Sequence, residues 1–134
     1  MSDKPKITDS HCHLDFPDFN DDLSEIINNA LQNGVCRMVT ICTRLKNEPL
    51  VRKISEDYKA VYYAAGNHPM SVSSEPMANF NELISLSKHP KFIAIGETGL
   101  DYYYTSETAE AQKKSLEIHI NACLLYTSPS PRDA

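Results

Sequence analysis

The chain of 134 residues alternates four times between an apolar run typical of a strand and an amphipathic run typical of a helix. The strand-like runs are residues 6–13, 35–42, 61–66 and 92–97, and the helix-like runs are residues 22–33, 48–58, 79–87 and 107–122. Within 22–33, apolar residues recur at the spacing of a single helix face: Leu23, Ile26, Ile27, Ala30 and Leu31. Successive strand–helix units predict a parallel sheet with helical crossovers. We therefore expect an α/β fold with about four such units.

Side chains able to do chemistry stand where strands pass into their loops. His11 and His13 end the first strand, His68 follows the third, and Glu97 ends the fourth. Successive strand side chains point to opposite faces, so His11 and His13 share a face while Cys12 points away. Because sites of parallel α/β folds lie at the carboxyl ends of the strands, we expect these groups at one end of the sheet.

Two neutral imidazoles held side by side are a common beginning of a protein metal site. Asp9 lies two residues before His11 on the same face, where it could orient a ligand. Glu97 follows apolar residues, and a carboxylate there is costly unless it is paired, hydrogen-bonded or bound to a metal. The residues alone leave other interpretations open. The histidines could be incidental, and Glu97 could cap a helix or pair with a lysine.

Composition narrows the class of protein. The net charge of −5 argues against a broad basic surface for nucleic acid, although bound divalent metals would themselves attract phosphates. There is no apolar run of about 18 residues and no N-terminal signal-peptide pattern. The four cysteines form no C-x-x-C pair, and Cys36 and Cys42 are expected to be reduced core thiols. We expect a cytoplasmic protein, nuclear if the source is eukaryotic, with no membrane partner and no obligate protein partner.

Other polar and aromatic residues receive weaker assignments. We expect His89 to cap a helix end and His119 to be structural, since nothing in the sequence places it at the strand ends. Asp15 and Asp101 could serve loop geometry or catalysis. The run Tyr102-Tyr103-Tyr104 could pack a loop or offer stacking surfaces to bases, and packing is favoured.

Three ordered segments, residues 9–15, 66–69 and 95–102, resemble the motifs of TatD-type deoxyribonucleases. The resemblance implies a (β/α)₈ TIM barrel of the metal-dependent hydrolase type, with residues 1–122 as its N-terminal half. It implies that His11 and His13 are metal ligands, that Glu97 bridges to a second metal, and that His68 contacts the substrate phosphate. The implied chemistry is hydrolysis of DNA phosphodiester bonds from an end. Its cofactors are divalent ions, two per full-length site, with Mg²⁺ favoured and Zn²⁺ or Mn²⁺ as alternatives.

The chain also departs from that family. A complete barrel needs about 250 residues, and the later ligands, two histidines and an aspartate expected as the general base, have no counterpart here. We expect this fragment to be inactive. Residues 123–134 break the helical periodicity and resemble a translated sequencing adapter, so we expect them to be non-native. Two other functions stay open: an amidohydrolase-type enzyme acting on a small-molecule amide, lactone or phosphoester, and a non-catalytic half-barrel binding module. The motif 96–101 favours the nuclease.

Overall fold

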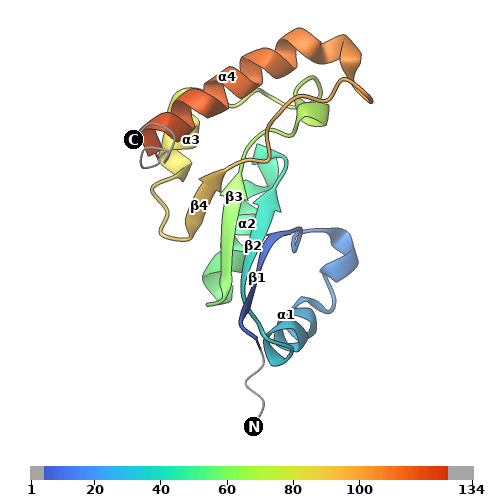
Figure 1. The fold of residues 1–134 in the computed structure, drawn as a ribbon, viewed down its shortest axis with the longest axis vertical. Coiled ribbons are helices and arrows are strands. Elements are labelled where there is room, and N and C mark those ends of the chain that lie inside the picture. Colours follow the sequence, from blue (N-terminus) through green and yellow to red (C-terminus); the bar gives the residue numbers. More distant parts are fainter. Residues whose placement is uncertain (1–4, 127–134) are drawn as a thin grey trace.

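The four predicted strands pair in chain order into one parallel sheet in the computed structural model, which describes residues 5–126 (Figure 1). The strands are β1 (Ile7–Cys12), β2 (Val35–Cys42), β3 (Val61–Ala65) and β4 (Phe92–Ile95). β1 and β4 are the edges of the sheet, and the exposed side chains of β1 from Ile7 to His11 show how little covers that edge. The predicted parallel α/β architecture is confirmed.

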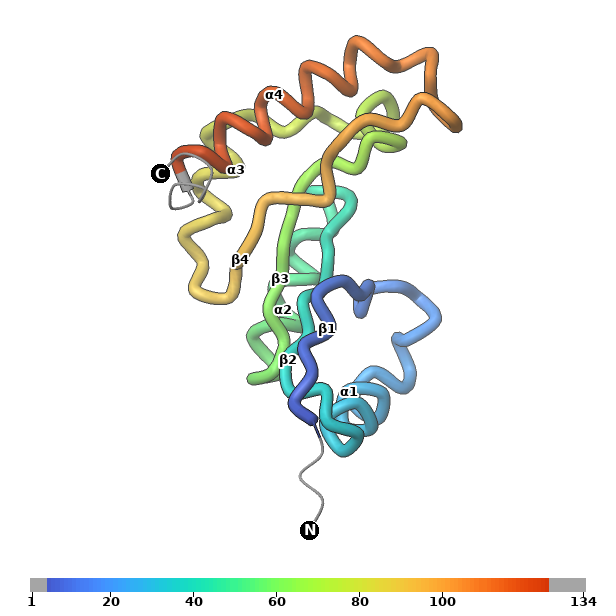
Figure 2. Tube along the Cα trace, in the orientation of Figure 1, coloured from blue at the N-terminus to red at the C-terminus, as the bar shows by residue number. Residues whose placement is uncertain are grey.

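Four helices alternate with the strands: α1 (Leu23–Gln32), α2 (Glu48–Asp57), α3 (Phe80–Leu86) and α4 (Ala109–Tyr126). α3 and α4 pack against each other at the upper end of the molecule, beside β4 (Figures 1 and 2). No helix of residues 5–126 is long and apolar enough to cross a membrane.

The predicted end of the last helix at Ala122 is wrong, because α4 continues to Tyr126. Leu124 and Leu125 are more than half exposed, so packing of these two side chains contributes little to the extension, whereas leucine favours a helix by propensity. Pro129 and Pro131, which disfavour a helix, come only later in the chain. The expectation that 123–134 is non-native stays a prediction, and residues 127–134 lie outside those the structure describes.

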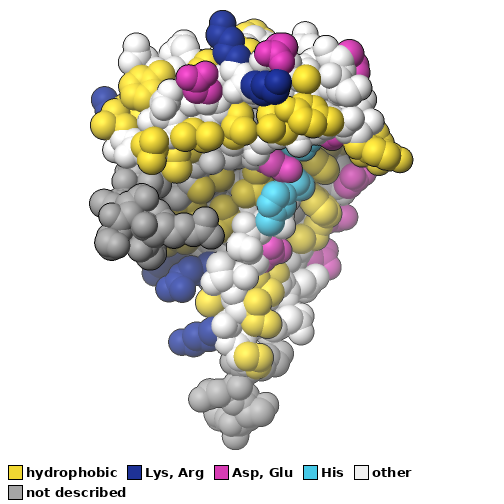
Figure 3. Space-filling model, turned by 45° about the horizontal axis from the view of Figure 1, so that its top comes forward, with side chains coloured by type: hydrophobic (Ala, Val, Ile, Leu, Met, Phe, Trp, Pro, Cys, Tyr) yellow, Lys and Arg dark blue, Asp and Glu magenta, His cyan; other side chains and the backbone are white. Residues whose placement is uncertain are grey.

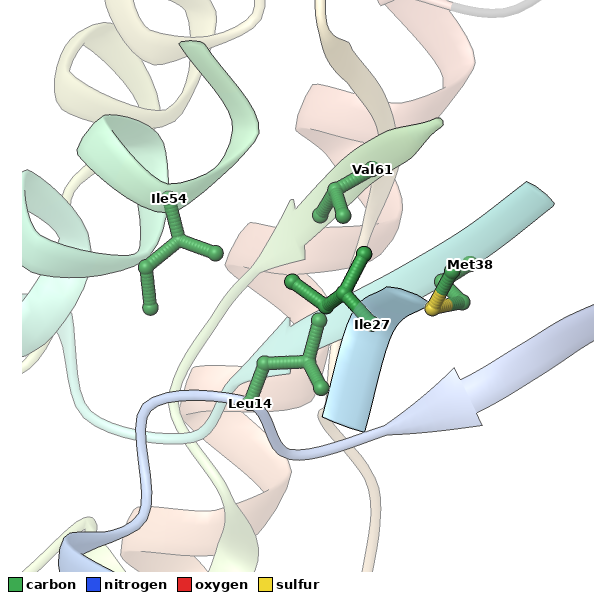
Figure 4. Packing of buried hydrophobic residues seen from close by; sticks show 5 residues of the cluster. All are labelled: Leu14, Ile27, Met38, Ile54 and Val61. Atoms are coloured by element: carbon green, nitrogen blue, oxygen red, sulfur yellow. The ribbon is translucent and has the colours of Figure 1, made fainter. Parts of the chain in front are cut away.

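One apolar core joins α1 and α2 to a face of the sheet. Figure 4 shows it closing between α1, α2, β2, β3 and the loop after β1, and its buried members are Leu14, Ile27, Met38, Ile54 and Val61. A second cluster surrounds Tyr63, which is fully buried. The Tyr63 hydroxyl donates a 2.9 Å hydrogen bond to Glu48 Oε1, and its ring packs edge-on against Phe92. These clusters fix where the carboxyl ends of the strands stand.

The cysteines differ in environment, and none of the four forms a disulfide. Cys42 is fully buried and its Sγ donates to the Arg44 carbonyl at 3.0 Å, so the prediction of a core thiol is confirmed for this residue. Burial raises the pKa of Cys42 to about 12. Cys36 is only partly buried. It is the second residue of β2, and the buried part of this strand begins at Met38. For Cys36 the prediction of a core thiol is wrong.

Candidate metal centre

Two histidines and a glutamate that are far apart in the sequence meet at the carboxyl end of the sheet. His11 and His13 come from the end of β1, and Glu97 lies two residues past the end of β4. One ligand atom from each of the three lies within 4.8 Å of the others. β1 and β4 are opposite edges of the sheet, but the chain leaving β4 crosses above the end of β3 toward β1 (Figures 1 and 2). This crossing brings the carboxylate to the imidazoles.

The His13 ring is fixed by a hydrogen bond and by a stacked aromatic ring. Its Nδ1 lies 3.1 Å from the Ile41 carbonyl oxygen, which can only accept, so Nδ1 carries the proton and Nε2 keeps a free lone pair. The ring also stacks on Phe16, with centroids 4.7 Å apart and an interplanar angle of 11°. A backbone carbonyl on the second imidazole nitrogen is a usual support of a metal-bound histidine.

His11 is supported through its backbone. The His11 amide donates to Asp9 Oδ1 at 3.1 Å, so Asp9 fixes the chain at His11 rather than the imidazole itself. The His11 and His13 rings meet edge to face, with centroids 5.1 Å apart. With imidazole nitrogens and a carboxylate oxygen as donors, the set suits a divalent transition ion.

Glu97 contacts histidines on both sides. Its Oε2 lies 3.5 Å from His11 Nε2 and its Oε1 lies 3.3 Å from His68 Nε2. His68 Nδ1 accepts the Met70 amide at 3.1 Å, so in the neutral ring the proton sits on Nε2 and points to Glu97. Among residues 5–126, Glu97 neither pairs with a lysine nor caps a helix, which were the alternatives left open by the sequence.

The four predicted site residues line one hollow of about 360 Å³, together with Phe16, Thr43, Arg44, Met70 and Ser71. Figure 3 shows histidine side chains gathered beside acidic ones below the overhanging upper part of the molecule. Thr43 and Arg44 were not predicted as site residues, although both follow the end of β2 directly. Arg44 Nη1 lies 3.5 Å from Glu75 Oε1, and about half of the Arg44 side chain is exposed, so its guanidinium group is accessible at the hollow. This is the chemistry that binds a phosphate oxygen.

Two predictions about neighbouring residues are decided by the geometry. The Asp101 Oδ1 atom accepts the amides of Tyr103 and Tyr104, both at 2.9 Å, so Asp101 serves loop geometry. Gln112 is fully buried and holds the same loop through Asp101 and Thr105. Tyr103 and Tyr104 are 86% and 69% exposed, so the prediction that these rings pack is wrong: the loop is pinned by its backbone and its rings face outward.

His89 and His119 were both predicted to have structural roles. The His89 backbone amide donates at 3.1 Å to the carbonyl of Leu86, the last residue of α3, so the prediction that His89 caps a helix end is confirmed for its backbone. Its side chain accepts the Lys91 amide and contacts Glu56 Oε1 at 3.0 Å. His119 is buried against the residues that follow β3, because α4 passes close to the end of that strand. The prediction that His119 is structural agrees with this burial, but the sequence did not reveal that α4 brings the ring to the end of β3. Asp15 is half-buried, with burial raising its pKa, and its Oδ1 accepts no hydrogen bond from the described residues.

Comparison with known proteins is consistent across sequence and structure. Residues 8–129 match the profile of the family described as TatD related DNase. A protein of Buchnera aphidicola from Acyrthosiphon pisum, named an uncharacterized metal-dependent hydrolase, is 33% identical over 132 residues, which cover 92% of this chain and 50% of that protein. A protein of Citrobacter koseri named 3'-5' ssDNA/RNA exonuclease TatD is 26% identical over 102 residues, covering 76% and 39%.

A solved structure gives the same result for the fold. The crystal structure of YjjV, a TatD homologue from Escherichia coli K12, superposes with a TM-score of 0.80 at 29% identity, covering 90% of this chain and 47% of that one. The predicted half of a TIM barrel is thereby confirmed as the fold of this chain. The chain spans about half the length of the curated relatives it matches.

Proposed function

The chain belongs to the TatD-related DNase family, and from that premise we propose that the protein it represents hydrolyses phosphodiester bonds of DNA with the help of divalent metal ions. The observation that carries this proposal is the meeting of His11, His13 and Glu97 at the carboxyl end of the sheet. In the sequence these three residues belong to two motifs more than 80 residues apart, and the motifs alone do not show that the residues meet. Their convergence gives the motifs a site in which a phosphate could be held.

Five residues of the hollow have proposed parts in this chemistry. His11, His13 and Glu97 would hold the metal, with the free Nε2 of His13 as one donor. A bound divalent ion would polarise a phosphoryl oxygen and lower the pKa of a water molecule. Mg²⁺ follows from the resemblance, and the imidazole-rich donor set also suits Zn²⁺ or Mn²⁺. His68 and Arg44 would contact the substrate phosphate, and the expected general-base aspartate is not among these residues.

The proposal also covers the position of cleavage on the nucleic acid and the cellular compartment. A relative is named an exonuclease of single-stranded DNA and RNA, which supports removal of nucleotides from an unpaired end. We expect DNA as the partner, with no membrane or obligate protein partner, and action in the cytoplasm. The second metal of the complete site would need ligands beyond the cluster formed by the described residues.

The proposal is tested with a single-stranded oligonucleotide labelled at one end and Mg²⁺ or Mn²⁺. We expect the product of the complete reading frame to shorten the oligonucleotide stepwise, and EDTA to stop the reaction. The 134-residue chain alone is expected to give no products. Hydrolysis of small esters or lactones but not of DNA would favour the amidohydrolase-type alternative. Binding of DNA by the complete product without cleavage would favour the binding module.

Sequencing the locus beyond the codon for Ala122 tests the assignment independently of activity. A frame that continues through two further histidine-bearing strands and a late aspartate is expected. The same experiment decides whether residues 123–134 are encoded by the gene. Should the natural frame stop directly after these residues, the nuclease assignment would be withdrawn for this product.

The exposed tyrosines give a further test of the substrate. The rings of Tyr103 and Tyr104 meet edge to face, with centroids 4.6 Å apart, in the same loop after β4 that contains Glu97. Base–aromatic stacking contributes roughly 1–3 kcal/mol per base, so replacing both residues with alanine is expected to raise KM for a single-stranded oligonucleotide about tenfold. Steady-state kinetics of the complete protein measure this effect.

The double change to phenylalanine is the matched control, because it keeps both rings and removes only the hydroxyls. Cleavage of a mononucleotide ester, which has no neighbouring base to stack, should be unaltered in both variants. Equal KM values for the oligonucleotide in the alanine and phenylalanine variants would exclude stacking on this loop.

A further inference from the structure

His119, on the buried side of α4, contacts the chain that leads from β3 to the metal centre. Its Nε2 lies 3.0 Å from the Asn67 backbone nitrogen, and both residues are 1% exposed. Its Nδ1 lies 2.7 Å from the Ser115 carbonyl, one turn back on the same helix. Both ring nitrogens therefore have partners inside the protein.

The partners fix the protonation of the ring. A backbone amide can only donate, so Nε2 of His119 must accept, and the single proton of the neutral ring lies on Nδ1 and is donated to Ser115. Burial lowers the pKa of His119, which keeps the ring neutral and its acceptor available. A hydrocarbon side chain of equal size would leave the buried Asn67 amide without an acceptor, a cost that proteins seldom accept.

Asn67 in turn fixes the neighbouring segments. Its side-chain Oδ1 accepts the Ala78 amide at 2.8 Å, so the residue ties the end of β3 to the chain that approaches α3. The next residue is His68, whose amide donates to the Thr43 carbonyl at 3.1 Å and whose Nε2 faces Glu97. The position of the Asn67 backbone therefore sets the position of the His68 backbone, from which the imidazole extends toward Glu97.

The same ring also lies beside the first residues after β3 and β4. A Cβ atom on Gly66 would lie 3.1 Å from His119 Cδ2 and 3.1 Å from both Cα and C of Gly96. Gly96 directly precedes Glu97. Glycine at position 66 thus allows the two strand ends and the His119 ring to meet without a gap.

We infer that His119 is a positioning residue of the metal centre: through its acceptor nitrogen α4 holds the Asn67 amide, and thereby places His68 against Glu97 so that the carboxylate faces His11 and His13. The inference rests on the proposed function, because it assigns His119 a task only if these residues bind a metal. It differs from a packing role, which would depend on the size of the side chain and not on an acceptor at one atom.

The test compares two polar replacements of His119 in the 134-residue chain. Glutamine can present its amide oxygen near the place of Nε2, whereas asparagine is shorter and reaches only the place of Nδ1. Co²⁺ affinity is measured by titration of its visible absorption. Loss of outer-shell support for a metal site weakens affinity by about 10–100-fold, so His119→Asn is expected to bind Co²⁺ at least about tenfold more weakly while His119→Gln binds like the unaltered chain.

Ser115→Ala is the matched control on the same buried helix face, because the Ser115 hydroxyl is buried and has no hydrogen-bond partner among the described residues. This control should leave Co²⁺ affinity unchanged. Circular dichroism establishes that each variant is folded. In the unaltered, ¹⁵N-labelled chain, a through-hydrogen-bond coupling between the Asn67 amide nitrogen and His119 Nε2 is expected, a signature that packing alone cannot produce.

The outcomes separate the inference from the function on which it rests. Equal Co²⁺ affinity in the glutamine and asparagine variants, or an equal loss in Ser115→Ala, would overturn the positioning role and leave the metal centre intact. Absence of the coupling would also overturn it. Failure of the unaltered chain to bind Co²⁺ would remove the metal centre itself, and the inference with it.

Discussion

Replacing His13 with alanine is expected to weaken Co²⁺ or Zn²⁺ binding by the chain by at least about 100-fold, more than outer-shell changes at metal sites usually cause. His13 is the best-organised member of the cluster, since the Ile41 carbonyl sets its tautomer and Phe16 sets the plane of its ring. Its removal leaves one imidazole and one carboxylate, too few donors for a stable site. Isothermal titration calorimetry measures the loss directly.

His89→Ala is the control for this prediction, because His89 is also partly buried and also lies near a glutamate, but stands away from the hollow. It should bind metal like the unaltered chain, at a stoichiometry of one ion. Full retention of affinity in His13→Ala would show that the metal is held elsewhere. Equal losses in both variants would point to nonspecific binding by histidines.

Truncating Tyr63 to alanine is expected to cost about 3–5 kcal/mol of the free energy of unfolding, the usual range for a large buried aromatic side chain. Tyr63 is fully buried, packs against Phe92 and bonds the buried Glu48 carboxylate. The variant loses apolar burial, opens a cavity between β3 and α2, and leaves Glu48 without its hydroxyl donor. Urea denaturation followed by circular dichroism measures the change.

Two further variants identify which part of Tyr63 matters. Tyr63→Phe keeps the ring and loses only the hydrogen bond, so a smaller cost of about 1–3 kcal/mol is expected. Tyr104→Ala removes a ring that is 69% exposed and should change stability by less than about 0.5 kcal/mol. A similar midpoint for Tyr63→Ala and Tyr104→Ala would contradict the core described for this face of the sheet.

The sequence predicted most of the fold because local patterns decide it. Amphipathic spacing located the helices, and apolar runs located the strands within two residues of their observed bounds. The end of α4 was the exception. The apolar periodicity breaks after Ala122, but the helix continues through Leu124 and Leu125, which are exposed and favour a helix by propensity. A helix can therefore extend beyond the end of its apolar pattern where its side chains are exposed.

The candidate site was predicted in part for a similar reason. Strand alternation and the shared end of parallel strands suffice to place His11, His13, His68 and Glu97 together. They do not say which groups Glu97 contacts, nor that Arg44 lies at the same hollow, because both depend on how the loops cross the end of the sheet. The packing predicted for Tyr103 was wrong, and the place of His119 at the end of β3 was not predicted, since local sequence does not reveal which side of a loop or helix faces the protein.

By itself the sequence determined the order of the strands and helices, the family, and the identity of the groups able to bind a metal, because each is written in residue type and spacing. Only the tertiary structure decided the tautomer of His13, the pairing of Glu97 with His11 and His68, and the burial of His119 beneath Asn67. These features arise between segments tens of residues apart. Hydrogen-bond direction and burial are properties of the packed chain, and no local pattern encodes them.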